Sequence, residues 1–371
     1  MLIKYKILYT IPNFDTAGSG KALFNIAKSL DDDIFEPHVC ISHTKGSFFQ
    51  IVKDSNVKIH IHKTTHEMIP RLKGLNSCWK LSRYFKSLDI DLIHSFHYGS
   101  DYSEALSARY AGIPWIFTKK NMNWGNRSKN SWKLRSFLSS RIIVQNNEMI
   151  STFYPNNKKV SLIPRGVDVN EFSKVGHRGI REKYKIPKNK KIIIAVANLV
   201  PVKGIHILID AFELICQKDN SYYLLIVGEK NTPYGKEMED KAFHSNYKSS
   251  IRLIGKVLDV KPFLSISSLF VLPTLNNNRK EGSPVSLLEA MSLGINVIAS
   301  KIAGVEDILS NFPENMFVPG DKKLLQKAII EQFKNSKSNK GNNFKSHIKN
   351  HFSLIREVSS HQKVYKNCLN I

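Results

Sequence analysis

The sequence has no long apolar run, and this excludes a membrane-spanning helix. No stretch of about 18 or more apolar residues occurs. The first eleven positions are apolar but are broken by Lys4 and Lys6, and no small-residue cleavage site follows them. We therefore expect a first strand there and no signal peptide.

Cysteine is scarce and unpaired in the sequence. Cys40, Cys78, Cys216 and Cys368 are far apart, with no C-x-x-C pair. This spacing argues against a zinc site and against a disulfide framework, and it is typical of a reducing compartment. We expect a cytoplasmic protein, peripheral on the inner face of the plasma membrane.

Acidic residues are few relative to basic ones. The 55 Lys and Arg against 31 Asp and Glu give a net charge of +24. Such a charge predicts an anionic partner, which could be nucleic acid, acidic lipid or a phosphorylated substrate. No nucleic-acid-binding module is recognisable, so we expect no nucleic acid; a basic nucleic-acid-binding protein stays open as an alternative.

Strand and helix patterns alternate along the 371 residues, which predicts an α/β fold with two tandem, doubly wound parallel sheets. We expect one domain over 1–172 and a second over 173–355, with a C-terminal helix over 356–371 that packs back toward the first. The polar stretch 174–181 marks the boundary. The expected strands are 6–11, 38–42, 58–62, 92–95, 115–118, 141–145, 191–197, 223–227, 251–254, 269–272 and 296–299.

The most informative motif runs from Glu281 to Glu289. Gly282 and Ser283 precede an expected helix over 285–293. Backbone N–H groups and the helix dipole at such a helix start favour an anion. A carboxylate inside the helix can accept bonds from a ribose diol. The segment could therefore hold a phosphorylated sugar, although carboxylates near helix starts also act as caps.

This segment resembles the Glu-x7-Glu motif of glycosyltransferase family 4, whose enzymes are retaining and have the GT-B architecture of two Rossmann-like domains facing a cleft. Further segments match the family in the same order along the chain: 163–168, 198–204, 225–228, 253–255 and 303–307. Gly18-Ser19-Gly20 stands where the family has a glycine-rich loop after its first strand, so we expect a loop over 12–19 and a helix over 20–30. The resemblance covers nearly the whole chain.

The resemblance implies a role for each matching residue. Lys203 would contact the donor diphosphate, and Glu281 would hold the donor sugar together with backbone N–H groups of Gly282, Ser283 and Val285. Glu289 would bind the ribose hydroxyls. The remaining implied donor-binding residues are Gly18, Gly20 and Asn198.

Two positions depart from the family pattern. Asn198 stands where the family usually has Arg, so diphosphate binding would depend more on Lys203. Lys120 stands where the family often has the histidine of Thr-x-His. We expect Lys120 and His97 to be catalytic residues on the acceptor side, with His94 also nearby.

Other motifs fail in detail, and we expect neither a divalent metal nor another cofactor. Gly20-Lys21 suggests a P-loop, but the first glycine of that motif would fall at Asp15, and Ala22 replaces Ser or Thr. Asp89-Ile90-Asp91 has a metal-binding D-x-D form but precedes its strand. Asp31-Asp32-Asp33 follows a helix and is expected to be exposed.

Residues 115–141 contain seven basic residues, three tryptophans and no acid. The basic residues are Lys119, Lys120, Arg127, Lys129, Lys133, Arg135 and Arg141. Trp124 and Trp132 among these bases are typical of a segment at a membrane surface. We expect this segment to contact an anionic membrane, with a mobile loop that binds a phosphorylated acceptor as the alternative.

The resemblance implies a retaining glycosyltransferase that moves a sugar from a nucleoside diphosphate to a glycan or lipid-linked acceptor in cell-surface polysaccharide biosynthesis, such as capsule or lipopolysaccharide. A nucleotide-sugar epimerase of GT-B fold is the main alternative among enzymes. It would turn over its substrate without any acceptor.

Overall fold

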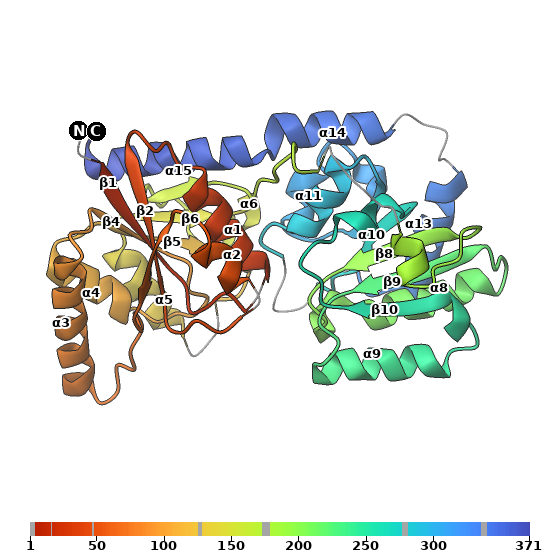
Figure 1. Cartoon of the computed structure of the whole chain (residues 1–371), viewed down its shortest axis with the longest axis horizontal. Coiled ribbons are helices and arrows are strands. Elements are labelled where there is room, and N and C mark those ends of the chain that lie inside the picture. The colour runs from red at the N-terminus through yellow and green to blue at the C-terminus, as the bar shows by residue number, and fades with distance from the viewer. Residues whose placement is uncertain are drawn as a thin grey trace. The chain divides into compact units, whose positions relative to one another are not determined.

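The computed structural model describes residues 4–15, 17–46, 48–124, 128–172, 179–276, 281–334 and 340–371. The chain forms two compact units, one of Met1–Arg165 with Leu354–Ile371 and one of Gly166–Ser353. The predicted α/β class with two parallel sheets is confirmed (Figure 1). The division lies after Arg165, whereas we predicted it at 172–173. Residues 174–178 of the predicted boundary stretch lie outside the described residues.

The first unit contains a seven-stranded parallel sheet in the order β3-β2-β1-β4-β5-β6-β7. Its strands are β1 Tyr5–Thr10, β2 Phe35–Ile41, β3 Lys58–Ile61, β4 Leu92–Ser95, β5 Trp115–Lys119, β6 Arg141–Val144 and β7 Val160–Leu162. Its helices are α1 Ala17–Lys28, α2 Phe49–Lys53, α3 Arg71–Ser87, α4 Ser103–Ala111, α5 Lys129–Leu138, α6 Asn147–Phe153 and α15 Leu354–Leu369.

Both faces of this sheet are buried. Side chains alternate between the two faces of a strand, so Ile7 and Tyr9 of β1 pack in one apolar cluster and Leu8 packs in the other. The last helix, α15, belongs to this unit. Its Tyr365 is fully buried, and its hydroxyl lies 3.1 Å from that of Tyr9.

The second unit contains a six-stranded parallel sheet in the order β10-β9-β8-β11-β12-β13. Its strands are β8 Lys191–Val196, β9 Tyr222–Val227, β10 Ile251–Gly255, β11 Leu269–Leu272, β12 Asn296–Ser300 and β13 Met316–Phe317. The helices are α7 Ile180–Lys183, η1 Pro201–Lys203, α8 Ile205–Cys216, α9 Pro233–His244, η2 Lys248–Ser250, α10 Lys261–Ser265, α11 Val285–Ser292, α12 Val305–Ile308, η3 Pro313–Asn315, α13 Lys322–Lys334 and α14 Lys340–His351.

The same alternation explains the apolar strands of this unit. Ile192 and Ile194 of β8 pack on one face of the sheet, and Ile193 and Ala195 pack on the other. Helices therefore cover both faces, and only the strand ends are left for a ligand. Among the described residues, no helix has the length and apolar character needed to cross a membrane.

Candidate active site

In the second unit, the loops that carry predicted site residues follow β8 and β11. Parallel strands end at a common edge, and α/β sheets bind ligands there. The loops after β8 and β11 lie against each other, because Leu275 N–H donates to the Val202 carbonyl at 2.7 Å. Gly204 has a φ of 64°, and a Cβ added to it would lie 2.1 Å from the Pro273 oxygen. Only glycine fits this position.

Lys203 and Glu281 form an ion pair at this edge. The Thr274 hydroxyl donates to the same carboxylate oxygen, Oε1, at 3.0 Å. The side chains of Lys203 and Glu281 are 21% and 13% exposed, so both remain accessible to a ligand. The structure thus brings together two predicted site residues that are 78 positions apart.

The backbone around Gly282 is closely packed at the start of α11. Gly304, which follows β12, has a φ of 77°, and a Cβ there would lie 2.4 Å from the Gly282 oxygen. Gly282 is buried, whereas Ser283 and Val285 are partly exposed. The first turn of α11 supplies N–H groups and a helix dipole that favour an anion beside Lys203 and Glu281.

Glu289 is buried within α11. Burial lowers the pKa of the nearby Lys261, but its hydrogen bond and ion pair with Glu171, together with the charges of Asp259 and Glu289, raise that pKa overall. The Lys261 ammonium lies 2.9 Å from a Glu171 oxygen. Lys261 therefore places a cation near Glu289, although no motif in the sequence marks this lysine. Asn198 is exposed in the loop after β8, where its carbonyl accepts from Val200 N–H at 2.9 Å.

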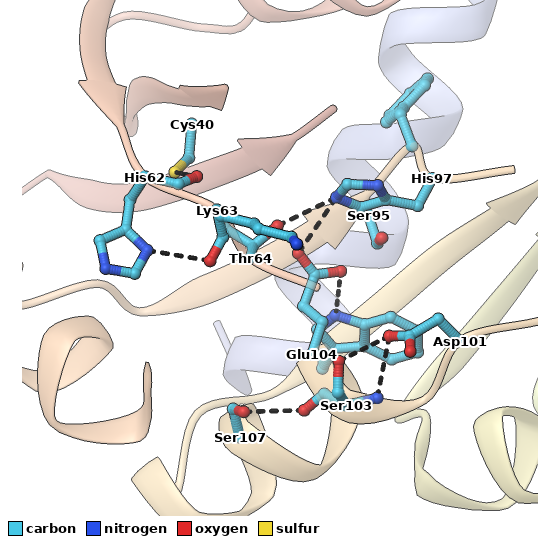
Figure 2. Close-up of polar contacts among 12 residues, drawn as sticks. Cys40, His62, Lys63, Thr64, Ser95, His97, Asp101, Ser103, Glu104 and Ser107 are labelled. Atoms are coloured by element: carbon cyan, nitrogen blue, oxygen red, sulfur yellow. Dashed lines mark hydrogen bonds and ion pairs between the residues drawn. The ribbon is translucent and has the colours of Figure 1, made fainter. Parts of the chain in front are cut away.

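In the first unit, His97 lies beyond the end of β4, and only 7% of it is exposed. Its Nε2 lies 3.0 Å from the Thr64 hydroxyl and 3.6 Å from Glu104 Oε1 (Figure 2). Burial lowers the pKa of His97 to about 4; the charge of Glu104 opposes this shift, and the smaller effects of Arg135 and Lys120 add to it. His97 is therefore neutral at pH 7.

Glu104 was not among the predicted residues, although it is fully buried. Trp115 Nε1–H donates to its Oε2 at 3.2 Å, and its Oε1 accepts no hydrogen bond from the described residues. The spacing offered a signal, because Glu104 and the buried Ala108 are four positions apart and share a face of α4.

Lys120 lies in the loop directly after β5. Its ammonium donates to the Phe96 carbonyl and lies 3.4 Å from the centre of the Tyr98 ring. Burial, followed by the charges of Arg165 and Arg135, lowers the pKa of Lys120 well below its usual value. Lys120 and His97 thus follow adjacent strands of one sheet.

His94 is fully buried, and both of its ring nitrogens have partners. Nδ1 lies 2.7 Å from the Tyr365 hydroxyl, and Nε2 lies 2.8 Å from the Thr118 hydroxyl. These contacts join β4 to β5 and α15. His94 therefore has a structural role in this unit.

Two protein-family models match consecutive parts of the chain. "Glycosyltransferase Family 4" matches residues 16–171, and "Glycosyl transferases group 1" matches residues 177–351. The chain belongs to glycosyltransferase family 4. Its two parallel-sheet units are those of the GT-B fold.

Relatives of this glycosyltransferase include an Escherichia coli enzyme named UDP-Gal:alpha-D-GlcNAc-diphosphoundecaprenol alpha-1,3-galactosyltransferase. It is 25% identical over 84% of each chain. A Campylobacter jejuni N,N'-diacetylbacillosaminyl-diphospho-undecaprenol alpha-1,3-N-acetylgalactosaminyltransferase is 23% identical over 77% of this chain and 78% of that one. Among solved structures, a Rickettsia africae glycosyltransferase covers 99% of both chains with a TM-score of 0.85 and 18% identity.

In this glycosyltransferase, Gly18 and Gly20 do not lie in a loop. Helix α1 begins at Ala17, so both glycines lie in its first turn, and the expected start at residue 20 is wrong. A Cβ at Gly20 would lie 2.7 Å from the Phe14 ring, whereas one at Gly18 would meet nothing within 4 Å. Gly20 thus serves close packing of α1.

The prediction that residues 115–141 form a surface segment of the glycosyltransferase is wrong for much of its length. Trp115, Trp132, Lys119 and Arg135 are buried. The Arg135 guanidinium lies 4.8 Å from the Trp115 ring centre, and the Lys119 ammonium lies 4.4 Å from that of Trp132. Burial lowers the pKa of Lys119 to about 7. These bases therefore stabilise the core through cation–π contacts. Arg127 lies outside the described residues.

The Asp89-Ile90-Asp91 motif lies away from the predicted site. Asp91 Oδ2 accepts from Lys6 N–H at 2.7 Å, and Asp89 forms an ion pair with the Lys6 ammonium at 2.8 Å. Both contacts lie at the starts of β1 and β4, at the edge opposite to the loops of His97 and Lys120. The motif therefore joins two strand starts. Asp31, Asp32 and Asp33 are exposed, as expected.

Proposed function

We propose that this glycosyltransferase moves a hexose from a uridine diphosphate sugar to a lipid-linked sugar, with retention of the anomeric configuration. The observation that carries this proposal is the ion pair of Lys203 and Glu281 beside the first turn of α11. This arrangement brings together the cation of Lys203, the carboxylate of Glu281, which can accept bonds from sugar hydroxyls, and a helix start that favours anions.

The chemistry of the donor explains why these groups suit it. Cleavage of the bond between sugar and diphosphate leaves negative charge on a phosphate oxygen. The Lys203 ammonium and the N–H groups of Gly282, Ser283 and Val285 would stabilise that charge. Glu281 would hold the sugar hydroxyls, and Glu289 would hold the ribose. Asn198 is uncharged, so we propose that Lys203 supplies the main positive charge, with no divalent metal and no other cofactor.

The named relatives support the choice of donor and acceptor. Their names specify a UDP-sugar donor for the Escherichia coli enzyme and diphosphoundecaprenol-linked acceptors for both enzymes. Further relatives are an O-antigen glycosyltransferase and a capsular polysaccharide glycosyltransferase. We therefore assign this chain to the assembly of a cell-surface polysaccharide, in the cytoplasm and at the surface of the membrane that holds the acceptor.

His97 and Lys120 are the residues we propose for the acceptor. Neutral His97 can accept a hydrogen bond from a sugar hydroxyl, while Thr64 fixes its ring through Nε2. Burial lowers the pKa of Lys120, which favours its neutral amine relative to an exposed lysine. The relatives named here are all glycosyltransferases, so they favour neither an epimerase nor a nucleic-acid-binding protein.

A thermal-shift panel of UDP, GDP, ADP and CMP with some of their sugars tests the donor site. A ligand at about 100 times its Kd adds about 2.7 kcal/mol of stability. We expect stabilisation by UDP and a UDP-hexose, and Lys203→Ala should weaken UDP binding about tenfold to a hundredfold. Lys218→Ala is the matched control, because exposed Lys218 lies beyond the opposite end of α8.

Two results would contradict the donor site. If no nucleotide stabilises the wild-type chain, the proposed donor site is wrong. If UDP stabilises Lys203→Ala as much as it stabilises the wild type, Lys203 does not bind the diphosphate. Turnover of a UDP-hexose to an epimer without any acceptor would instead identify an epimerase.

A further inference from the structure

Helix α3 of the first unit has two apolar faces, although only one of them is buried. Gly74, Cys78, Leu81 and Phe85 form its inner face, and α3 packs there against α4. Figure 1 shows α3 on the outer side of α4. A surface helix with such an inner face normally carries polar residues on its outer face.

The outer face of α3 instead exposes large apolar side chains. Leu72 is 84% exposed and Trp79 is 51% exposed. They are seven positions apart and therefore lie in line along the helix. Leu75 is 40% exposed, and Ile69, just before the helix, is 85% exposed. Four large apolar side chains are thus exposed within eleven positions, and we call this set the stripe.

Within α3 itself, every charged residue is basic. The 17 residues of α3 contain Arg71, Lys73, Lys80, Arg83 and Lys86, all of them exposed, and no Asp or Glu. The Arg83 guanidinium lies 5.0 Å from the centre of the Trp79 ring. The helix that carries the stripe thus has five exposed positive charges.

We propose that the outer face of α3 docks on an anionic lipid surface. This inference rests on the proposed function, in which the acceptor is carried on a lipid. Helices that lie in a membrane interface combine Lys and Arg with Trp and Leu. Leu72, Trp79 and Ile69 would enter the boundary between headgroups and acyl chains, and the flanking bases would contact lipid phosphates. Interfaces between proteins are depleted in Lys, so this composition suits a lipid better than a protein.

Vesicle sedimentation with the full chain tests the proposal. The vesicles contain phosphatidylcholine alone or with an equal amount of phosphatidylglycerol. We expect binding to the anionic vesicles only, with a loss at high salt because salt screens charges. Each base near an anionic leaflet contributes about a fivefold gain in binding. Lys73→Glu with Lys80→Glu should therefore weaken binding at least tenfold, and so should Leu72→Ser with Trp79→Ser.

Matched controls change similar side chains in the second unit. Phe243→Ser removes an aromatic residue that is 66% exposed, and Lys323→Glu with Lys349→Glu reverses two exposed charges. Both controls should bind like the wild type. Urea unfolding followed by the fluorescence of Trp115, Trp124 and Trp132 confirms that the first unit of each α3 variant is folded, and stabilisation by UDP does so for the second unit.

Quenching by brominated lipids gives a second readout. The chain has four tryptophans, and Trp79 is exposed, whereas Trp115 and Trp132 are buried and Trp124 is partly buried. Anionic brominated vesicles should quench the wild-type fluorescence, and Trp79→Phe should lose that quenching while it still sediments with the vesicles.

Each further outcome has a distinct meaning. If the wild type binds anionic vesicles and the α3 variants bind equally well, the α3 surface is wrong while membrane association stands. If the wild type binds no vesicle, both the α3 docking surface and the membrane association are wrong. UDP binding still tests the donor site separately. Equal binding to neutral vesicles excludes a role for the bases. If the wild type is a dimer and Leu72→Ser with Trp79→Ser makes it a monomer, the outer face of α3 binds a second copy of the chain and not a lipid surface.

Discussion

Arg165 and Glu357 form a buried ion pair with an N–O distance of 2.9 Å, although they are 192 positions apart. The pair joins the last residue of the segment 1–165 to α15, and both belong to the first unit. Breaking a buried ion pair leaves an uncompensated charge and costs about 3–5 kcal/mol. We expect Glu357→Ala to destabilise the first unit by that amount.

Urea unfolding followed by tryptophan fluorescence measures this effect, because all four tryptophans lie in the first unit. Glu67→Ala removes an exposed carboxylate of the same unit and should change stability by less than about 0.5 kcal/mol. Arg165→Met with Glu357→Leu removes both charges and should be more stable than Glu357→Ala alone. A loss below about 1 kcal/mol in Glu357→Ala would show that the pair does not hold α15 in place.

Glu281→Gln should separate sugar binding from diphosphate binding. We expect the Kd of UDP to change by less than about threefold, because Lys203 still contacts the diphosphate. Sugar transfer should fall about a hundredfold, because Glu281 is proposed to hold the sugar in the transition state. Glu289→Gln is the contrasting variant and should weaken UDP and UDP-hexose alike, since it is proposed to bind the ribose. Calorimetric titration measures both ligands, and equal effects of the two variants would refute the division of roles.

The first unit should lose stability as the pH falls below 6.5. Burial lowers the pKa of His97 to about 4 and that of His361 to about 3, from an ordinary value of 6.5. Between these values the unfolded chain binds more protons than the folded one, so the free energy of unfolding decreases as the pH falls. His97 alone should account for about 2 kcal/mol at pH 5.

Tryptophan-monitored urea unfolding at pH 7 and pH 5 measures this dependence. His97→Asn should make the dependence shallower. Ser42→Ala, at an exposed residue of the same unit that does not titrate in this range, should leave it unchanged. If His97→Asn and the wild type have the same pH dependence, His97 is not held neutral in the folded chain.

Gly204→Ala should disrupt the donor side of the second unit. The substitution combines an unfavourable φ of 64° with a Cβ placed 2.1 Å from the Pro273 oxygen. Gly320→Ala is the control, because Gly320 has a φ of 88° but nothing within 4 Å of its Cβ position. The control should cost about 1–2 kcal/mol from backbone strain alone. Calorimetric unfolding should show a larger loss for Gly204→Ala, together with weaker UDP binding; similar losses in both would mean that the loop after β11 can move away.

Most of the buried strands could be predicted from the sequence because they contain apolar runs, such as Leu269–Leu272. β4 and β11 have the predicted bounds, and β8 ends one residue earlier than predicted. The start of α1 was misplaced because glycine disfavours a helix, yet Gly18 and Gly20 lie in its first turn. β7 was missed because it has only three residues, none of them buried.

The candidate site was predictable only where a motif marks it. The pairing of Lys203 with Glu281 follows from the parallel sheet, because the loops after the neighbouring strands β8 and β11 leave the same edge. Lys119 and Arg135 were expected at the surface because basic residues are seldom buried. No pattern in the sequence predicts which aromatic rings will contact these buried charges. The outer face of α3 was overlooked because apolar residues on both sides of the helix obscure its periodicity.

The return of α15 to the first unit has a consequence for biosynthesis. Residues 166–353 form a complete unit that leaves the ribosome before the segment 354–371 does. The core of the first unit therefore cannot be completed until Tyr365 and Glu357 have been synthesised, after the whole of the second unit. A stop codon introduced before position 354 would thus damage the half of the enzyme that is translated first.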